Sequence, residues 1–342
     1  MAAPLSASFR RRLALHAYRS GSAIACALPD RLAKAAERPL GAILVLAMGA
    51  RRQMVERHLR RVHVVPLSSS TLRTASRRSF ESYARYWIES LRLPAMGGDE
   101  IDAGMWAEGL PHLDAALAAG NGAILVLPHL GGWDFAGAWL VRRGYPLAVV
   151  VEPVEPPELL AWFTTLRTGV GLKVIPLGPQ AGSAVLRELR ANRVVALLCD
   201  RDIGGGGVEV EFFGERTTLP GGPMTLALRA GAAVLPTAVY FEGNGGHRGE
   251  IRPSLATRRQ GSLRADVARL TQDLAVGLES LIRAAPEQWH LFQPNWPSDR
   301  RQVSASRRHR SLSTRRRTPV TARDNRSDPR QPRRLEKKRN MS

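Results

Sequence analysis

From residue 123 to residue 241 the chain alternates short apolar runs with longer segments of helical pattern. Apolar runs of this length are typical of buried strands, and strands that alternate with helices predict a parallel sheet with helices on its faces. We therefore expect an α/β fold with a central, mostly parallel sheet. The expected strands are residues 123–127, 147–151, 173–176, 194–199, 208–213 and 233–241, and the helices between them are 133–143, 157–168, 180–191 and 220–230.

The sequence divides into three regions around this sheet. Residues 1–70 combine helical periodicity with many arginines and predict amphipathic helices. Residues 71–300 contain the sheet, its helices and a last helix at 262–284, and form the α/β domain. Residues 301–342 carry 15 Lys or Arg against three acidic residues and few large apolar ones, so we expect a disordered basic tail.

Charge restricts the partners of this chain. Its formal net charge is +20, of which +12 lies in residues 301–342. Such a basic chain attracts nucleic acid or an anionic membrane surface. Because neither zinc-finger spacing nor a basic pattern interleaved with aromatic residues is visible, we expect no nucleic-acid partner. The helices of residues 1–70 either pack on the domain or lie at a membrane interface, and the sequence leaves both alternatives open.

Other classes of protein are excluded by what the sequence lacks. The longest apolar stretch, residues 39–50, is too short to cross a bilayer, so we expect no transmembrane anchor. Cys26 and Cys199 are far apart in sequence and imply no disulfide framework. Histidines and cysteines do not occur at ligand spacing, so we expect no metal site.

The segment LPHLGGWD at 127–134 is the strongest functional motif. It follows the strand at 123–127, and in open α/β sheets ligands bind at the carboxyl ends of strands. A histidine side chain such as that of His129 can accept a proton from an alcohol, while Asp134, on the next turn, can hold the ring in one tautomer. The alternative is a hydrogen-bonded turn histidine followed by an acid that a helix N-terminus favours.

Several segments in the same order resemble the lysophospholipid acyltransferase superfamily, specifically the actinobacterial phosphatidylinositol mannoside acyltransferases, which are related to the lipid A late acyltransferases. The resemblance covers about residues 70–297 and implies a glycerol-phosphate-acyltransferase-like fold. It makes 71–300 an acyltransferase domain. The segments are SYARYWIESLRLP at 82–94, LPHLGGWDFAGAWL at 127–140, VVVEP at 149–153, LRTGVGLKVIPL at 166–177, CDRD at 199–202, GVEVEFFGE at 207–215 and EQWHLFQPNW at 287–296.

The resemblance implies transfer of a fatty acyl group, palmitoyl in our expectation, from acyl-CoA to a mannose hydroxyl of a phosphatidylinositol mannoside. His129 matches the catalytic histidine and Asp134 the carboxylate of its motif. A sugar hydroxyl is a weak nucleophile at neutral pH, so a base must remove its proton. Because no GxSxG motif supplies a serine nucleophile, we expect direct transfer. Acyl-CoA is then a co-substrate, and no cofactor is expected.

Three further site residues follow from the same resemblance. In GVEVEF, Glu209 and Glu211 alternate with valines and share one strand face, and we choose Glu209 as the glutamate that assists the histidine. Glu152 matches an acceptor-binding acid, and Arg167 a basic position that contacts a phosphate. Each has a plain alternative as a solvated surface residue. Gly132 stands where relatives often have asparagine, which would loosen the turn.

The expected location is the cytoplasmic face of the plasma membrane, where the protein would bind peripherally. Two rival readings stay open. One is an acyltransferase of the same fold with another glycolipid acceptor. The other is a non-catalytic, basic adaptor for a membrane or nucleic acid that keeps the scaffold.

Overall fold

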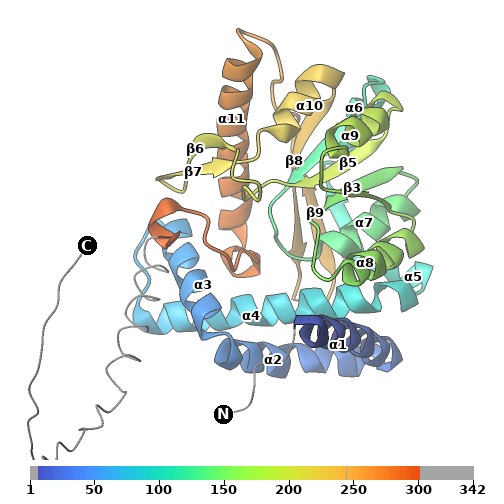
Figure 1. The fold of residues 1–342 in the computed structure, drawn as a ribbon, viewed down its shortest axis with the longest axis vertical. Helices are drawn as coiled ribbons and strands as arrows, with labels where there is room; N and C mark the ends of the chain where they lie inside the picture. Colours follow the sequence, from blue (N-terminus) through green and yellow to red (C-terminus); the bar gives the residue numbers. More distant parts are fainter. Residues whose placement is uncertain (1–6, 244, 301–342) are drawn as a thin grey trace, which may run out of the picture. The chain divides into compact units, whose positions relative to one another are not determined.

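A seven-stranded sheet lies at the centre of the structure, a computed structural model that describes residues 7–243 and 245–300 (Figure 1). The strand order is β1-β9-β8-β2-β5-β3-β4, and every neighbouring pair is parallel except β8 with β9. The predicted α/β fold is confirmed. The strands are β1 (Met105–Glu108), β2 (Ala123–Leu127), β3 (Leu147–Val151), β4 (Lys173–Pro176), β5 (Val194–Leu198), β8 (Ala233–Phe241) and β9 (His247–Ile251).

Helices cover both faces of the sheet and enclose two apolar cores. On one face lie α9 (Ala181–Arg190), α10 (Gly222–Ala230) and α11 (Leu263–Ala284). On the other lie α5 (Gly98–Ala103), α6 (Leu110–Ala118) and α7 (Trp133–Arg142). The five residues of β2 are all buried, because this central strand contacts both cores. The remaining helix of the α/β pattern, α8 (Pro157–Gly169), packs beside β4.

Ahead of α5, the described residues form four α-helices, three of which lie in the region 1–70 where the sequence predicts helices. They are α1 (Ala7–Ala27), α2 (Asp30–Ala47), α3 (Gly49–Val62) and α4 (Ser69–Arg92). The long helix α4 runs across the base of the sheet in Figure 1, with α1 and α2 on its outer side. Gly41 of α2 permits close contact with α4, since a Cβ there would lie 2.7 Å from the Cα of Glu81. Among the described residues, no helix has both the length and the apolar character needed to span a membrane.

One expected strand lies outside the central sheet. Residues 208–212 form β6 (Val208–Phe212), which pairs only with β7 (Glu215–Leu219) in an antiparallel hairpin. We placed this segment in the main sheet and did not predict β7. We also missed the edge strand β1 and its neighbour β9, because their sequences MWAE and HRGEI are too polar for the apolar pattern that identifies central strands.

The described residues up to Asp299 form one compact unit. Residues 301–342, for which we predicted a disordered tail, lie outside the described part of the chain. The boundaries that separate an N-terminal region from the domain at about residue 70 stay a prediction. Both cysteines are free thiols, and Cys199 is buried at the end of β5.

Candidate active site

His129 lies in a tight turn at the carboxyl end of β2, as the sequence predicts. Gly131 makes the turn possible: its φ is +62°, and a Cβ there would lie only 2.0 Å from the carbonyl oxygen of Val239. Helix α7 then begins at Trp133. The ring of His247 fills the space beside Gly132, where a Cβ would lie 2.7 Å from it. The turn is therefore closely packed rather than loosened by Gly132.

Asp200 holds the His129 ring. The ring Nδ1 lies 2.6 Å from Asp200 Oδ1, and the backbone N–H of His129 donates to Oδ2 of the same carboxylate over 2.9 Å. Asp200 is fully buried, whereas the His129 side chain is 17% exposed. The two residues meet because Leu127 of β2 pairs with Leu198 of β5, and each functional residue lies two positions beyond its strand's last residue.

The surroundings of Asp200 keep its carboxyl ionised. Burial by itself would raise the pKa of Asp200, but the charge and hydrogen bonds of His129 and the hydrogen bond from Trp289 lower that pKa to about 2. Asp200 is thus an anion at neutral pH and can accept a hydrogen bond from an N–H at the ring Nδ1. In the neutral tautomer that carries its proton on Nδ1, the ring presents an unprotonated Nε2, which is the nitrogen that can accept a proton from a hydroxyl.

We predicted that Asp134 orients the ring of His129, but its carboxylate binds other residues. Asp134 accepts two hydrogen bonds from Arg167, at 2.9 and 3.0 Å, and one from the hydroxyl of Tyr86 at 2.9 Å. This carboxylate therefore anchors a buried Arg–Tyr cluster, and the ring of His129 is oriented by Asp200 instead. Burial, followed by the charge of Asp134, raises the pKa of Tyr86 well above its ordinary value, which keeps the phenol protonated.

Glu209 does not enter the site. The side chain is 68% exposed on β6 and forms a surface ion pair with Arg216. The predicted alternation of β6 is correct, but it is Val210 and Phe212 that are buried and both glutamates that face solvent. Our assignment of Glu209 as the residue that assists His129 is therefore wrong, and the same exposure applies to Glu211.

Glu152 and Arg167 do lie near His129. Both line the same cavity as the histidine, Glu152 from the segment after β3 and Arg167 from the end of α8. Glu152 forms an ion pair with Arg201, which follows Asp200 in the chain and also lines the cavity. The structure therefore groups these two predicted residues with His129, while their binding roles stay predictions.

The cavity has a volume of about 360 Å³ and mainly apolar walls. One wall is α7, with Ala136, Gly137 and Leu140, and the opposite wall is the sheet. Lining residues come from six neighbouring strands, β1, β9, β8, β2, β5 and β3. At about 4.8 Å between strands, six strands span about 24 Å. A long, narrow apolar ligand fits such a space.

Aromatic side chains and the segment after α11 enclose the polar end of the cavity. Tyr83, Tyr86 and Trp87 approach from α4. His290 is buried, and its backbone N–H donates to the backbone carbonyl of His129 over 2.7 Å. Burial, followed by the charge of His129, lowers the pKa of the His290 ring to about 3. His290 is therefore a neutral wall residue. Among the described residues, no cluster of His, Cys, Asp and Glu is arranged to hold a metal ion.

Comparison with known proteins decides the family. The family described as bacterial lipid A biosynthesis acyltransferase matches residues 8–298. The chain belongs to this family. Its resemblance to phosphatidylinositol mannoside acyltransferases is also confirmed: a protein of that name from Mycobacterium tuberculosis (strain CDC 1551 / Oshkosh) is 46% identical over 235 residues, which cover 67% of this chain and 72% of the relative.

Two more relatives belong to the same acyltransferase group. A phosphatidylinositol mannoside acyltransferase of Mycolicibacterium smegmatis is 42% identical over 227 residues, covering 65% of this chain and 72% of the relative. A lipid A biosynthesis acyltransferase of Haemophilus influenzae is 31% identical over 188 residues, covering 53% and 55%. The chain is accordingly an acyltransferase, and the arrangement of His129, Asp200 and the apolar cavity is its candidate active site.

Proposed function

We propose that this protein transfers a fatty acyl group, palmitoyl as the preferred one, from acyl-CoA to a mannose hydroxyl of a phosphatidylinositol mannoside. The observation that carries the proposal is that His129, which is paired with Asp200, lines a long apolar cavity. The acceptor class comes from the names of the relatives that are 42–46% identical.

The chemistry needs one base and no covalent enzyme intermediate. The Nε2 atom of His129 takes the proton of the mannose hydroxyl as its oxygen attacks the thioester carbonyl. The negative charge of Asp200, 2.6 Å from Nδ1, stabilises the imidazolium that forms. The C–S bond then breaks, and the imidazolium returns the proton to the departing thiolate. The products are the acylated glycolipid and free coenzyme A.

The acyl chain of the donor would occupy the cavity between α7 and the sheet. A linear hydrocarbon gains from leaving water at about 0.8 kcal/mol per methylene. The six strands along this wall provide a path long enough for a long-chain acyl group. At the polar end, the thioester carbonyl would lie beside His129.

The acceptor would bind at the cavity's polar end. Glu152 accepts hydrogen bonds from sugar hydroxyls in this proposal, and its ion pair with Arg201 holds it in place. Asp134 engages Nε and one Nη of Arg167, so the guanidinium has donors left for a phosphate oxygen of the lipid.

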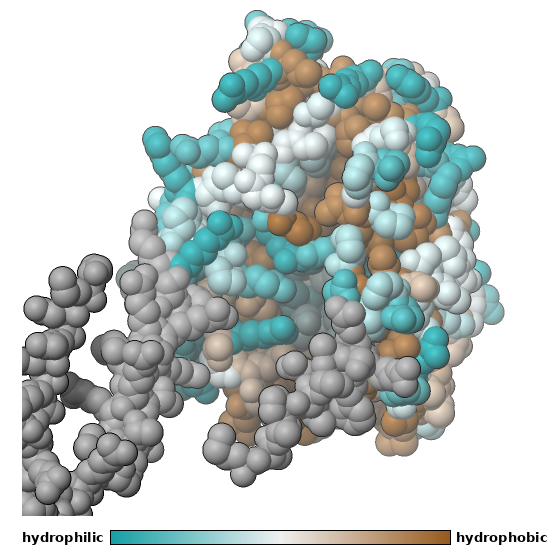
Figure 2. Space-filling model, in the orientation of Figure 1, coloured by the Kyte–Doolittle hydropathy of each residue, from teal (hydrophilic) through white to brown (hydrophobic). Residues whose placement is uncertain are grey.

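We propose further that the protein binds the cytoplasmic face of the plasma membrane peripherally, through α2. Along α2 an apolar stripe faces solvent at helical spacing, including Leu32, Ile43 and Leu46, which are 56%, 60% and 81% exposed. Exposed Arg31, Lys34 and Arg38 lie in the first half of the same helix and suit anionic headgroups. In Figure 2 brown, apolar atoms lie along the lower edge of the molecule, the edge where Figure 1 shows α1 and α2.

The test is acyl transfer from palmitoyl-CoA to mono- and dimannosylated phosphatidylinositol, followed by mass spectrometry of the product. Wild type should form an ester of the sugar, and His129→Ala should form none. Equal activity of both proteins would refute the role of His129. Parallel reactions with palmitoyl-acyl carrier protein decide the donor, since the same thioester chemistry operates on either carrier.

A different acceptor is the nearest competing function. If wild type transfers no acyl group to either mannoside but acylates another glycolipid, the proposed acceptor is wrong and the proposed chemistry stands. A salt-dependent affinity for nucleic acid without any acyl transfer would instead support the adaptor reading.

A further inference from the structure

The segment that follows α11 runs directly along the turn of His129. Leu130 and Trp289 form an isolated antiparallel β-bridge. The backbone N–H of Gly131 donates to the backbone carbonyl of Gln288 over 3.0 Å, and the backbone N–H of His290 donates to the backbone carbonyl of His129 over 2.7 Å. The backbone of residues 288–290 is thus attached to both sides of the turn. Trp289 lies at the centre of this attachment.

The indole of Trp289 reaches the carboxylate that orients His129. Its Nε1–H donates to Asp200 Oδ2 over 2.7 Å. Oδ2 also accepts from the His129 backbone, which leaves Oδ1 facing the ring Nδ1. Trp289 is 4% exposed and Asp200 is fully buried, so water does not compete for these bonds.

We propose that Trp289 is a positioning residue for acyl transfer, acting through Asp200. Its indole N–H fixes the rotation of the carboxylate, so that Oδ1 faces the ring. The same hydrogen bond stabilises part of the negative charge of the carboxylate. This inference rests on the proposed role of His129 as the base. Without the indole N–H, the carboxylate directs its whole charge to the imidazole, and the ring holds its proton to a higher pH.

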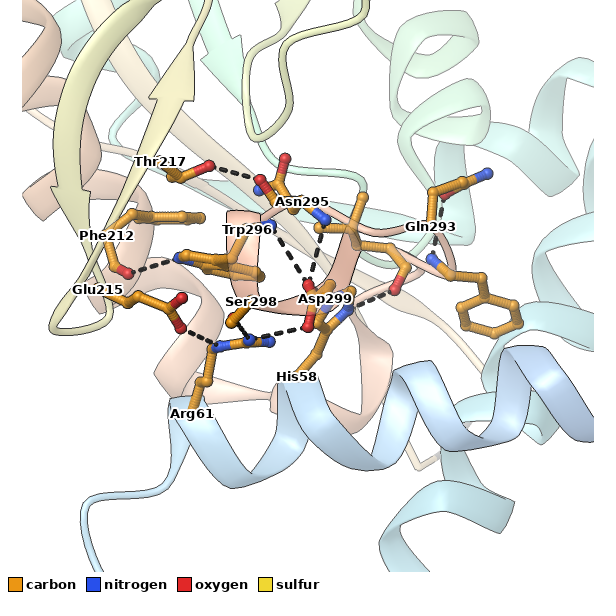
Figure 3. Close-up of polar contacts among 12 residues, drawn as sticks. His58, Arg61, Phe212, Glu215, Thr217, Gln293, Asn295, Trp296, Ser298 and Asp299 are labelled. Atoms are coloured by element: carbon orange, nitrogen blue, oxygen red, sulfur yellow. Dashed lines mark hydrogen bonds and ion pairs between the residues drawn. The ribbon is translucent and has the colours of Figure 1, made fainter. Parts of the chain in front are cut away.

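The same segment is clamped at its far end, as Figure 3 shows. Asp299 accepts from the backbone N–H groups of Asn295 and Trp296 and from Arg61 of α3 at 2.8 Å. His58 Nδ1 lies 2.8 Å from the carbonyl of Leu291. Between the two ends, the Asn295 amide donates to the Asp200 carbonyl over 3.0 Å. Residues 288–299 are therefore held against both Asp200 and α3, which makes Trp289 a rigid donor.

Trp296 provides a matched control in the same segment. It is also a buried tryptophan, and its Nε1–H also makes one hydrogen bond, to the backbone carbonyl of Phe212 over 3.1 Å. Replacing either residue with phenylalanine removes one indole N–H and similar packing. Only Trp289→Phe removes a donor to the carboxylate of Asp200. Trp296→Phe therefore measures the cost of damaging the segment.

The experiment compares wild type, Trp289→Phe and Trp296→Phe in palmitoyl-CoA transfer to the mannosylated acceptor across pH 5 to 9. We expect Trp289→Phe to lower kcat about tenfold or more, because a hydrogen bond to a charged group is lost, with KM nearly unchanged. The acidic limb of its pH–rate profile should move to higher pH. Trp296→Phe should keep the wild-type limb and a kcat within about twofold of wild type at equal folded fraction.

A second measurement separates this inference from the proposed reaction. Nitrogen NMR of ¹⁵N-histidine-labelled protein follows the tautomer and protonation of His129 without any substrate, with His129→Gln used to assign the signals. A ring that keeps its proton to a higher pH in Trp289→Phe alone supports the inference, even if the acceptor is another lipid. Identical titrations in both variants, or a shift to lower pH in Trp289→Phe, would overturn it. Wild type that transfers no acyl group would instead count against the proposed function.

Discussion

Replacing Asp200 with asparagine should remove most of the catalytic power while leaving the cavity intact. The substitution keeps the size of the side chain and removes the negative charge that lies beside Nδ1 of His129 at 2.6 Å. With the charge centres of ring and carboxylate about 4 Å apart, their attraction is worth about 4 kcal/mol at an effective dielectric constant of about 20. This attraction exists only once the ring has taken the proton of the hydroxyl.

The expected result is a fall in kcat of about 10³-fold, since each 1.36 kcal/mol corresponds to a factor of about ten. Asparagine can also hold the ring in the wrong tautomer, which acts in the same direction. KM for the donor should change little, because Asp200 is buried and is not one of the described residues that line the cavity. Initial rates with radiolabelled palmitoyl-CoA, at matched folded protein, measure both constants.

Glu209→Gln is the comparison that tests the reasoning. It removes a carboxylate that is 68% exposed and paired with Arg216 at the surface. We expect its kcat to stay within about twofold of wild type, as surface substitutions usually have small effects. If Asp200→Asn kept more than a tenth of the wild-type kcat, or if Glu209→Gln fell as far as Asp200→Asn, the assignment of Asp200 as the orienting carboxylate would be wrong.

Three further predictions follow from the same geometry. The pKa of Asp200 is about 2 in the folded protein and about 3.9 when unfolded, so its ionisation adds roughly 2 kcal/mol of stability above about pH 4, which is lost as pH falls through 2; the difference in unfolding free energy between wild type and Asp200→Asn should shrink from pH 5 to pH 2 in urea titrations, and a constant difference would contradict it. Gly249→Val should lower the ratio of palmitoyl to lauroyl transfer, because its Cβ would already lie 2.8 Å from Met105 in the cavity wall; an unchanged ratio would exclude this end of the cavity as the acyl site. Leu46→Glu should weaken sedimentation with anionic vesicles by about tenfold and leave transfer to detergent-dispersed acceptor unchanged, whereas unaltered vesicle binding would remove α2 from the membrane contact.

The sequence predicts the central part of the fold better than its edges. The strand at 123–127, the turn with His129 and the start of α7 at Trp133 all follow from apolar runs and glycines, which are local signals. Strand β1, at the edge of the sheet, and its neighbour β9 carry Trp106, Glu108, Arg248 and Glu250, so their pattern resembles that of loops. Tertiary pairing, which a single sequence does not display, decides their conformation.

The candidate site shows the same division. His129 was found because its motif is contiguous, whereas Asp134 was chosen as its partner only because it is near in sequence. The partner, Asp200, is 71 residues away. A usable signal was present: His129 and Asp200 each follow an apolar strand by two residues, and neighbouring parallel strands bring such positions together at one edge. Trp289 gave no comparable signal, because its contact depends on how the segment after α11 crosses the sheet.

The clamp between α3 and residues 288–299 also has a consequence for the order of synthesis. A ribosome makes His129 and Asp200 long before it makes Trp289 and Asp299, yet the carboxylate, the indole and Arg61 are joined only when the last of these has docked. A partly synthesised chain therefore has His129 and Asp200 without Trp289, and its apolar cavity lacks the residues after α11 that line one end. In our proposal the site is therefore complete only after residues 289–299 have been made, and a chain that stalls before residue 289 lacks the indole that positions Asp200.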